Sequence, residues 1–185
     1  MPNWCENKLI ALSTNKEQLK EVHDLFDKVE EGVFNKISPT PQELLDSEAW
    51  SNDEEKNAEM RAKYGANDWY MWRVDNWGTK WDINETHSLS YHEEYEEMYD
   101  GRILGAVITG FDTAWAPPEE FIYTLSIKYP EVYFHLSYEE PGMAFAGCYA
   151  VLDGEVKDQA QTEMYSDVDR VMDQAGFYFE IATGE

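Results

Sequence analysis

The sequence has little positive charge and no long apolar run, and each absence excludes a class of protein. Its 14 basic residues stand against 38 acidic ones, which gives a net charge of −24. Nucleic acid and anionic lipid need Lys and Arg to replace their counterions, so we expect no direct nucleic-acid binding and no membrane contact. The apolar stretches are far shorter than the roughly 18 residues that a membrane helix requires.

Cysteine is also scarce, with Cys5 and Cys148 as the two thiols of the chain. The first six residues have neither the basic region nor the apolar core of a signal peptide. We therefore expect a cytoplasmic protein whose cysteines are reduced. Neither cysteine has a basic neighbour in sequence that would lower its pKa, so the pattern disfavours nucleophilic catalysis.

Recognised cofactor and catalytic motifs are missing as well. The chain has no phosphate-binding glycine loop, no His-Glu-x-x-His helix and no Gly-x-Ser-x-Gly turn. The acidic residues near position 170 resemble a calcium loop, but Met172 stands where that loop needs glycine. The four histidines show no spacing typical of metal ligands. We predict no bound metal, nucleotide or iron–sulfur cluster, and the pattern favours a protein that is not an enzyme.

The chain does contain enough apolar and aromatic side chains for one domain. Of its 185 residues, 43% are hydrophobic and 15% are aromatic, which argues against disorder. We predict a single domain over residues 1–185. Residues 42–68 are polar and acidic with few apolar anchors, so we interpret them as an insertion with short helices.

Hydrophobic periodicity predicts a mixture of strands and helices. We expect strands at 8–12, 33–37, 106–111, 132–138, 143–152 and 177–181, with residues 76–82 forming a turn that leads into another strand. Helices are expected at 19–29, 121–129 and 166–175, and Asp153-Gly154 indicates a hairpin turn. This order predicts an α+β fold with helices on one face of a mostly antiparallel sheet.

Three groups of motifs resemble a known family. They are PNWCEN at residues 2–7, WGTKWD at residues 77–82, and FDTAWAPP at 111–118 together with YEEPGMAFAG at 138–147. They resemble the YubB-like family, small proteins of phages and plasmids with no established activity. The resemblance implies a ferredoxin-like two-layer sandwich without an iron–sulfur cluster, and an accessory role in a mobile element. The acidic stretches at 43–59 and 87–99 lie outside the family pattern.

The motif tryptophans lie beside turn residues and form the first candidate site. We predict that Trp77, Trp81 and Trp115 are largely buried and structural, because indole rings can close the end of a sandwich. The alternative is a cleft for a small ligand or substrate. That cleft would be lined by Trp77, Lys80, Trp81, Asp82, Trp115 and Glu139.

The acidic segments form the second candidate site. The partner-binding residues predicted there are Glu54, Glu55, Glu93, Glu94, Glu96 and Glu97. A helix over residues 93–100 would place like charges four apart, at a cost of a few tenths of a kcal/mol for each pair. We hypothesise that these residues bind a basic host protein, as an anti-defence factor that mimics DNA. An acidic surface that serves only solubility is the other interpretation.

Overall fold

The computed structural model describes residues 3–47, 52–96 and 103–163, and its centre is a six-stranded sheet. The strand order is β2-β3-β1-β4-β5-β6, and each neighbouring pair is antiparallel. The strands are β1 (Trp4–Ser13), β2 (Ser88–Glu96), β3 (Ile103–Ala114), β4 (Tyr133–Glu140), β5 (Phe145–Leu152) and β6 (Glu155–Glu163). The helices are α1 (Lys16–Asp27), the 3-10 turn η1 (Val29–Glu31), α2 (Phe34–Ile37), α3 (Gln42–Leu45), α4 (Glu54–Tyr64), α5 (Trp69–Trp77) and α6 (Glu119–Lys128).

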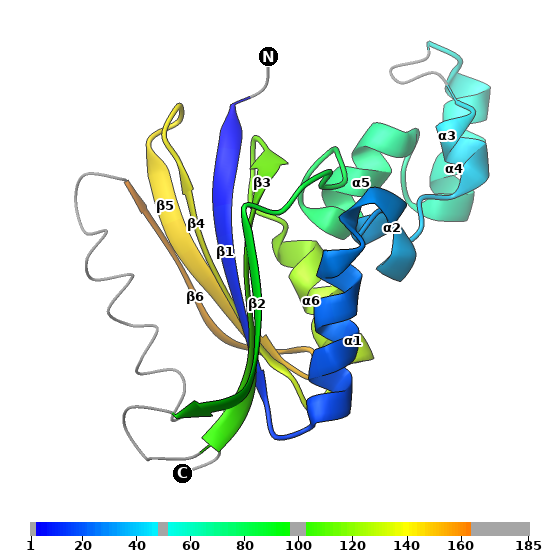
Figure 1. The fold of residues 1–185 in the computed structure, drawn as a ribbon. Helices are drawn as coiled ribbons and strands as arrows, with labels where there is room; N and C mark the ends of the chain where they lie inside the picture. Colours follow the sequence, from blue (N-terminus) through cyan, green and yellow to red (C-terminus); the bar gives the residue numbers. More distant parts are fainter. Residues whose placement is uncertain (1–2, 48–51, 97–102, 164–185) are drawn as a thin grey trace.

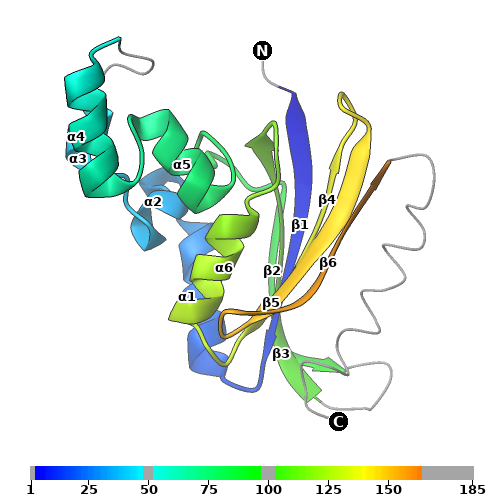
Figure 2. The ribbon, with the colours of Figure 1, turned by 180° about the vertical axis from the view of Figure 1, so that it is seen from behind.

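The connections give the predicted ferredoxin-like sandwich. Helix α1 leads from β1 to β2 across β3, and α6 leads from β3 to β4 across β1, which is the split βαβ arrangement. Strands β5 and β6 extend the sheet beyond β4. Both views show α1 and α6 on the same face of the sheet, which confirms the predicted α+β class (Figures 1 and 2).

The core lies between that face and the helices. Alternate residues of β1 point into it, and Cys5, Leu9 and Ala11 are almost fully buried. Helix α1 begins after Asn15, whose side chain accepts hydrogen bonds from the next turn's backbone amides. The helices contribute Leu19, Val22, Phe26, Phe121, Ile122 and Leu125 to the same hydrophobic cluster.

The predicted strand at 33–37 is wrong, because this segment contains helix α2. The Asp82 carboxylate accepts hydrogen bonds from the backbone amides of Val33, Phe34 and Asn35, at 3.1, 2.9 and 2.9 Å. A carboxylate at a helix N-terminus satisfies amides that the helix leaves unpaired and complements its dipole. The partner lies 49 residues away along the chain, so local periodicity does not reveal it.

The strand expected after the turn at 76–82 is likewise absent there. Helix α5 ends at Trp77, and Gly78 follows in the left-handed conformation with φ of 82°. The chain then runs irregularly to β2 at Ser88. Strand β2 includes Glu93 and Glu94, so the helix considered for 93–100 is wrong over its described part.

In the C-terminal part of the chain, the predicted hairpin is present and a further strand follows it. The hairpin at Asp153-Gly154 is confirmed, because both residues have positive φ, at 49° and 70°, as a tight hairpin turn requires. Strand β6 was not predicted, since an edge strand need not bury an apolar row. The helix expected at 166–175 and the strand expected at 177–181 lie outside the described residues.

We expect the Asp82 carboxylate to be needed for the attachment of α2 to the loop that precedes β2. Asp82→Ala removes three backbone hydrogen bonds from the α2 segment to a charged acceptor, besides one from the Ile83 amide, and should lower the free energy of unfolding by about 2–3 kcal/mol. Asp82→Asn keeps one acceptor oxygen, so its free energy of unfolding should fall by less than that of Asp82→Ala. Urea denaturation measures both variants, and equal losses would contradict a role for the charge.

Candidate functional site

The sequence motifs meet at one end of the sheet. Trp4 pairs with Ala114 at the end of the β1–β3 ladder. Just beyond β3, the Trp115 amide donates a hydrogen bond to the Asn3 carbonyl at 3.0 Å. The Thr79 hydroxyl donates to the Ala114 carbonyl at 2.9 Å, which brings the segment 77–82 to the same place.

The turn between β4 and β5 reaches this end as well. The buried Glu140 carboxylate accepts a hydrogen bond from the Gly142 amide at 3.0 Å and another from the Met143 amide. A side chain on Gly142 would overlap the amide group of Asn3, so Asn3 would have to shift to make room for it. Met143 is 65% exposed at the tip of the turn.

Three tryptophans stay partly exposed where these segments meet. Trp4, Trp81 and Trp115 are 46%, 40% and 44% exposed. The ring centroids of Trp4 and Trp81 lie 6.3 Å apart. The Lys80 ammonium nitrogen lies 3.9 Å from the centroid of the Trp81 ring and 6.0 Å from that of Trp115. We call these four residues, Trp4, Lys80, Trp81 and Trp115, the Trp edge.

The prediction that Trp81 and Trp115 are largely buried is therefore wrong. The segment that carries Trp81 is anchored by Thr79 and Asp82 on its two sides, so its indole is not needed to hold the loop. Trp115 has φ of 74°, a left-handed conformation that costs a residue with a Cβ about 1–3 kcal/mol. Strained backbone of this kind is concentrated at functional sites.

Trp77 is buried, as predicted. Its indole nitrogen donates to the Ser38 carbonyl at 2.9 Å, and its ring packs against Phe34 and Trp72. The Arg73 guanidinium lies 4.7 Å from the same ring centroid. Trp77 thus joins α5 to α2 and to the core.

The residues predicted to line a cleft do not come together as one group. Lys80, Trp81 and Trp115 meet at the Trp edge, whereas Asp82 binds the amides of α2. Glu139 lies in β4, opposite Glu6 of β1. Trp4 was missing from the predicted site, although it stands in one of the sequence motifs.

Carboxylates form a row beside the Trp edge. Glu6 of β1 lies opposite Asp112 of β3 on one side and Glu139 of β4 on the other. Glu6 is two residues from Trp4 along β1, so the strand period places both on one face. Like charges directly opposite each other destabilise a sheet. The His87 imidazole, 2.9 Å from an Asp112 oxygen, is held by that carboxylate, which raises the His87 pKa.

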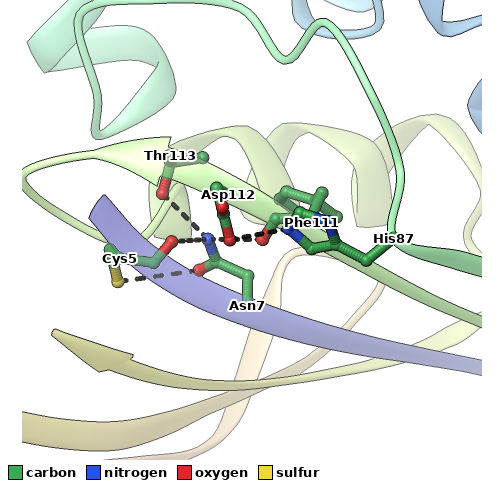
Figure 3. A network of polar contacts seen from close by, with 6 residues as sticks. All are labelled: Cys5, Asn7, His87, Phe111, Asp112 and Thr113. Carbon is green, nitrogen blue, oxygen red and sulfur yellow. Dashed lines mark hydrogen bonds and ion pairs between the residues drawn. The ribbon is translucent and has the colours of Figure 1, made fainter.

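A buried polar network lies at this end of the sheet (Figure 3). The Asn7 amide donates to the carbonyls of Cys5 and Phe111, at 2.8 and 3.2 Å, and to the Thr113 hydroxyl at 2.9 Å. Thr113 in turn donates to the Ala116 carbonyl at 2.7 Å. Burial, with a further contribution from the nearby Glu140 charge, raises the Cys5 pKa to about 12, so this thiol is protonated at neutral pH. The network holds the strand ends that present Trp4 and Trp115.

The predicted acidic partner site is split between separate parts of the molecule. Glu54 and Glu55 lie in the first turn of α4, where acidic side chains favour the helix itself. Glu93 and Glu94 are exposed in β2, beside a bulge between His92 and Tyr95. Glu96 ends β2, and Glu97 lies outside the described residues. Figures 1 and 2 place α4 and the end of β2 at opposite ends of the molecule.

The described residues contain neither a recognisable metal site nor a membrane-spanning helix. Within residues 3–47, 52–96 and 103–163, no group of three or more His, Cys, Asp or Glu side chains is arranged to hold a metal ion. No helix of the described segments is long and apolar enough to cross a bilayer. A shallow hollow of about 400 Å³ lies among α1, α2 and α6, and none of the predicted cleft residues lines it.

A buried histidine lies on the sheet face away from the helices. His135 of β4 is 5% exposed, and neither ring nitrogen has a hydrogen-bond partner among the described residues. It lies opposite Ile10 of β1 and Ala150 of β5. Burial lowers the His135 pKa, with the Asp158 carboxylate opposing this effect and the Lys8 ammonium reinforcing it.

We expect His135 to make the protein less stable in acid. Below the ordinary histidine pKa of 6.5, the unfolded chain binds a proton that folded His135 resists, so stability falls as the pH falls. His135→Leu should flatten the change in urea midpoint between about pH 7.5 and 5.5, relative to the wild type. If the urea midpoints of the wild type and of His135→Leu change with pH in parallel, His135 has the same pKa in the folded and the unfolded chain, and the prediction is wrong.

The tryptophans should separate into structural and surface classes. Trp77→Ala opens a cavity in the core and should lower the free energy of unfolding by about 3–5 kcal/mol. Trp81→Ala removes a partly exposed ring and should lower the free energy of unfolding by less than about 1.5 kcal/mol. Part of this loss comes from the cation–π contact with Lys80. Thermal or urea unfolding compares the two variants. A loss for Trp81→Ala as large as that for Trp77→Ala would make Trp81 a core residue.

Comparison with known proteins places the chain in a family. The family model described as a ferredoxin-like domain in Api92-like protein matches residues 76–178, more than half of the chain. A crystal structure of the protein Api92 from Yersinia pseudotuberculosis aligns over 88% of this chain and 98% of that chain, with a TM-score of 0.48 and 9% sequence identity. No curated protein matches the sequence. The YubB-like family and a phage or plasmid setting stay predictions. The chain belongs to the family of ferredoxin-like domains in Api92-like proteins.

Proposed function

We propose that the chain is a non-enzymatic accessory protein that binds a basic protein surface through its Trp edge. The observation that supports this most directly is the exposure of Trp4, Trp81 and Trp115 at the point where distant segments meet. Clustered exposed aromatic side chains mark interaction sites, and tryptophan is enriched among residues that dominate binding energy. The strained Trp115 backbone supports the same assignment, because strain of this kind is concentrated at functional sites.

The charge of the chain supports a basic partner. The net charge of −24 attracts cationic surfaces over long range and repels anionic ones. Close to the Trp edge, the row formed by Asp112, Glu6 and Glu139 places like charges on three adjacent strands. A basic partner relieves that repulsion when it binds, which favours the complex and its orientation.

The thiols support a role without covalent catalysis. Burial is the main cause that raises the pKa of both Cys5 and Cys148 to about 12, and in Cys148 the hydrogen bond to Asp158 contributes to that rise. A nucleophilic cysteine needs the opposite shift. In the setting that the YubB-like resemblance implies, the partner would be a host protein with a basic nucleic-acid groove. The acidic chain would then compete with DNA for that groove, as an anti-defence factor.

Affinity capture from a lysate of the source cell, followed by identification of the bound proteins, tests this proposal. The wild type should retain proteins with basic surfaces at about 0.05 M salt and release them as salt rises to about 0.5 M, because screening shortens the reach of charge. Trp81→Ala/Trp115→Ala should lose the same proteins while keeping its fold. Glu6→Gln/Glu139→Gln should weaken their retention and reduce its salt dependence.

Glu54→Gln/Glu55→Gln is the matched control for the acidic pair beside the Trp edge. It removes the same charge from α4, which both views place apart from the sheet (Figures 1 and 2). We expect this control to retain the captured proteins better than the Glu6/Glu139 variant does. Undiminished capture by the tryptophan variant would show that the Trp edge is not the interface.

A further inference from the structure

We propose that the Lys80 ammonium occupies a cation site between Trp81 and Trp115, and that an arginine side chain of the basic partner displaces it. This inference rests on the proposed function and specifies the group that the Trp edge recognises. The Lys80 nitrogen lies 3.9 Å from the Trp81 ring centroid and 6.0 Å from that of Trp115. Both distances fall within the range in which the face of an indole ring attracts a cation.

Among the described residues, the Lys80 ammonium contacts two aromatic rings and no carboxylate, although the chain has a large excess of carboxylates. Lys36, Lys63 and Lys157 each contact a carboxylate, at 2.6, 2.6 and 2.7 Å. Lys80 forms no ion pair with any residue of the described segments. The two indoles therefore form a site that already holds a cation with no counter-charge from the described segments.

The Lys80 side chain can leave this site without moving the backbone. On one side, the Thr79 hydroxyl is bonded to the Ala114 carbonyl. On the other side, Asp82 binds the amides of α2, and the Lys80 carbonyl itself accepts a hydrogen bond from Arg73 at 3.4 Å. The backbone is thus fixed while the four-carbon side chain turns on rotatable bonds. Its removal exposes the faces of Trp81 and Trp115.

An arginine is the best replacement for this lysine. Its guanidinium is planar, stacks on indole faces and is more weakly hydrated than an ammonium ion. Its five donors also reach carboxylates in pairs. At this end of the sheet, the row of Asp112, Glu6 and Glu139 supplies acceptors that Lys80 does not use. Charge complementarity therefore favours an arginine that stacks on the indoles and pairs with this row.

The experiment uses a short capped peptide with one central arginine, and the same peptide with neutral citrulline in its place. Binding is followed by NMR shifts of the indole Nε1–H groups of the full chain. Lys80→Met frees the rings and should raise the affinity for the arginine peptide about two- to fivefold, the factor expected for one exposed cation–π contact. The citrulline peptide should show no such gain. Trp81→Ala should lower the arginine affinity.

The variant Lys80→Arg distinguishes displacement of the residue-80 side chain from an effect of the protein's net charge on peptide affinity. This variant keeps the charge and supplies a cation that stacks better, so it should lower the affinity for the arginine peptide below that of the wild type. Lys8→Met removes an exposed lysine of β1 that lies over no aromatic ring of the described residues, and it should change the affinity far less than Lys80→Met. An equal gain in Lys8→Met would assign the effect to net charge and overturn the proposal.

An unchanged or lower affinity in Lys80→Met would also overturn it, because Lys80 would then belong to the binding surface. This outcome is distinct from failure of the proposed function. If capture of basic proteins needs Trp81 and Trp115 but Lys80→Met gives no gain, only the displacement by arginine fails. If the tryptophan variant captures the same proteins as the wild type, the interface itself is wrongly placed.

Discussion

The pairing of β1 with two neighbours is the constraint on which the rest of the structure depends. Its ten residues pair with β3 on one side, and residues 6–12 also pair with β4 on the other. This double ladder brings the N-terminal motif beside segments more than 100 residues away. The buried side chain of Asn7 reinforces the junction, because its amide donates to backbone and side-chain acceptors of β3. The Trp edge exists because the ends of these strands coincide.

The segment between α1 and β2 is attached to this sandwich by a few specific contacts. Trp77, the last residue of α5, lies in the core, and its indole nitrogen donates a hydrogen bond to the Ser38 carbonyl. The Asp82 carboxylate accepts hydrogen bonds from the first turn of α2. A side chain on Gly78 would collide with the Pro117 carbonyl, so this glycine allows the loop to approach the start of α6 closely. These contacts position Lys80 and Trp81 and leave their side chains at the surface.

Several features at this end of the sheet oppose folding or contribute little to it. Three indoles remain partly exposed, the Trp115 backbone is left-handed, and like charges face each other across three strands. Each feature costs free energy in the isolated chain. Their concentration in one place is the physical basis for the proposed binding surface. By contrast, the acidic side chains of Glu54 and Glu55 in α4 stabilise a helix N-terminus and need no partner to account for them.

The sequence by itself determined the α+β class, the helices near 19–29 and 121–129, the hairpin at Asp153-Gly154 and the motifs that form the Trp edge. These follow from hydrophobic periodicity and turn chemistry, which act between residues close in the chain. Only the tertiary structure decided that 33–37 is helical, since the Asp82 carboxylate comes from a distant loop. It also decided which tryptophans are buried. Burial of an indole depends on the segments packed around it, and strand pairing over long sequence separations assembles those segments.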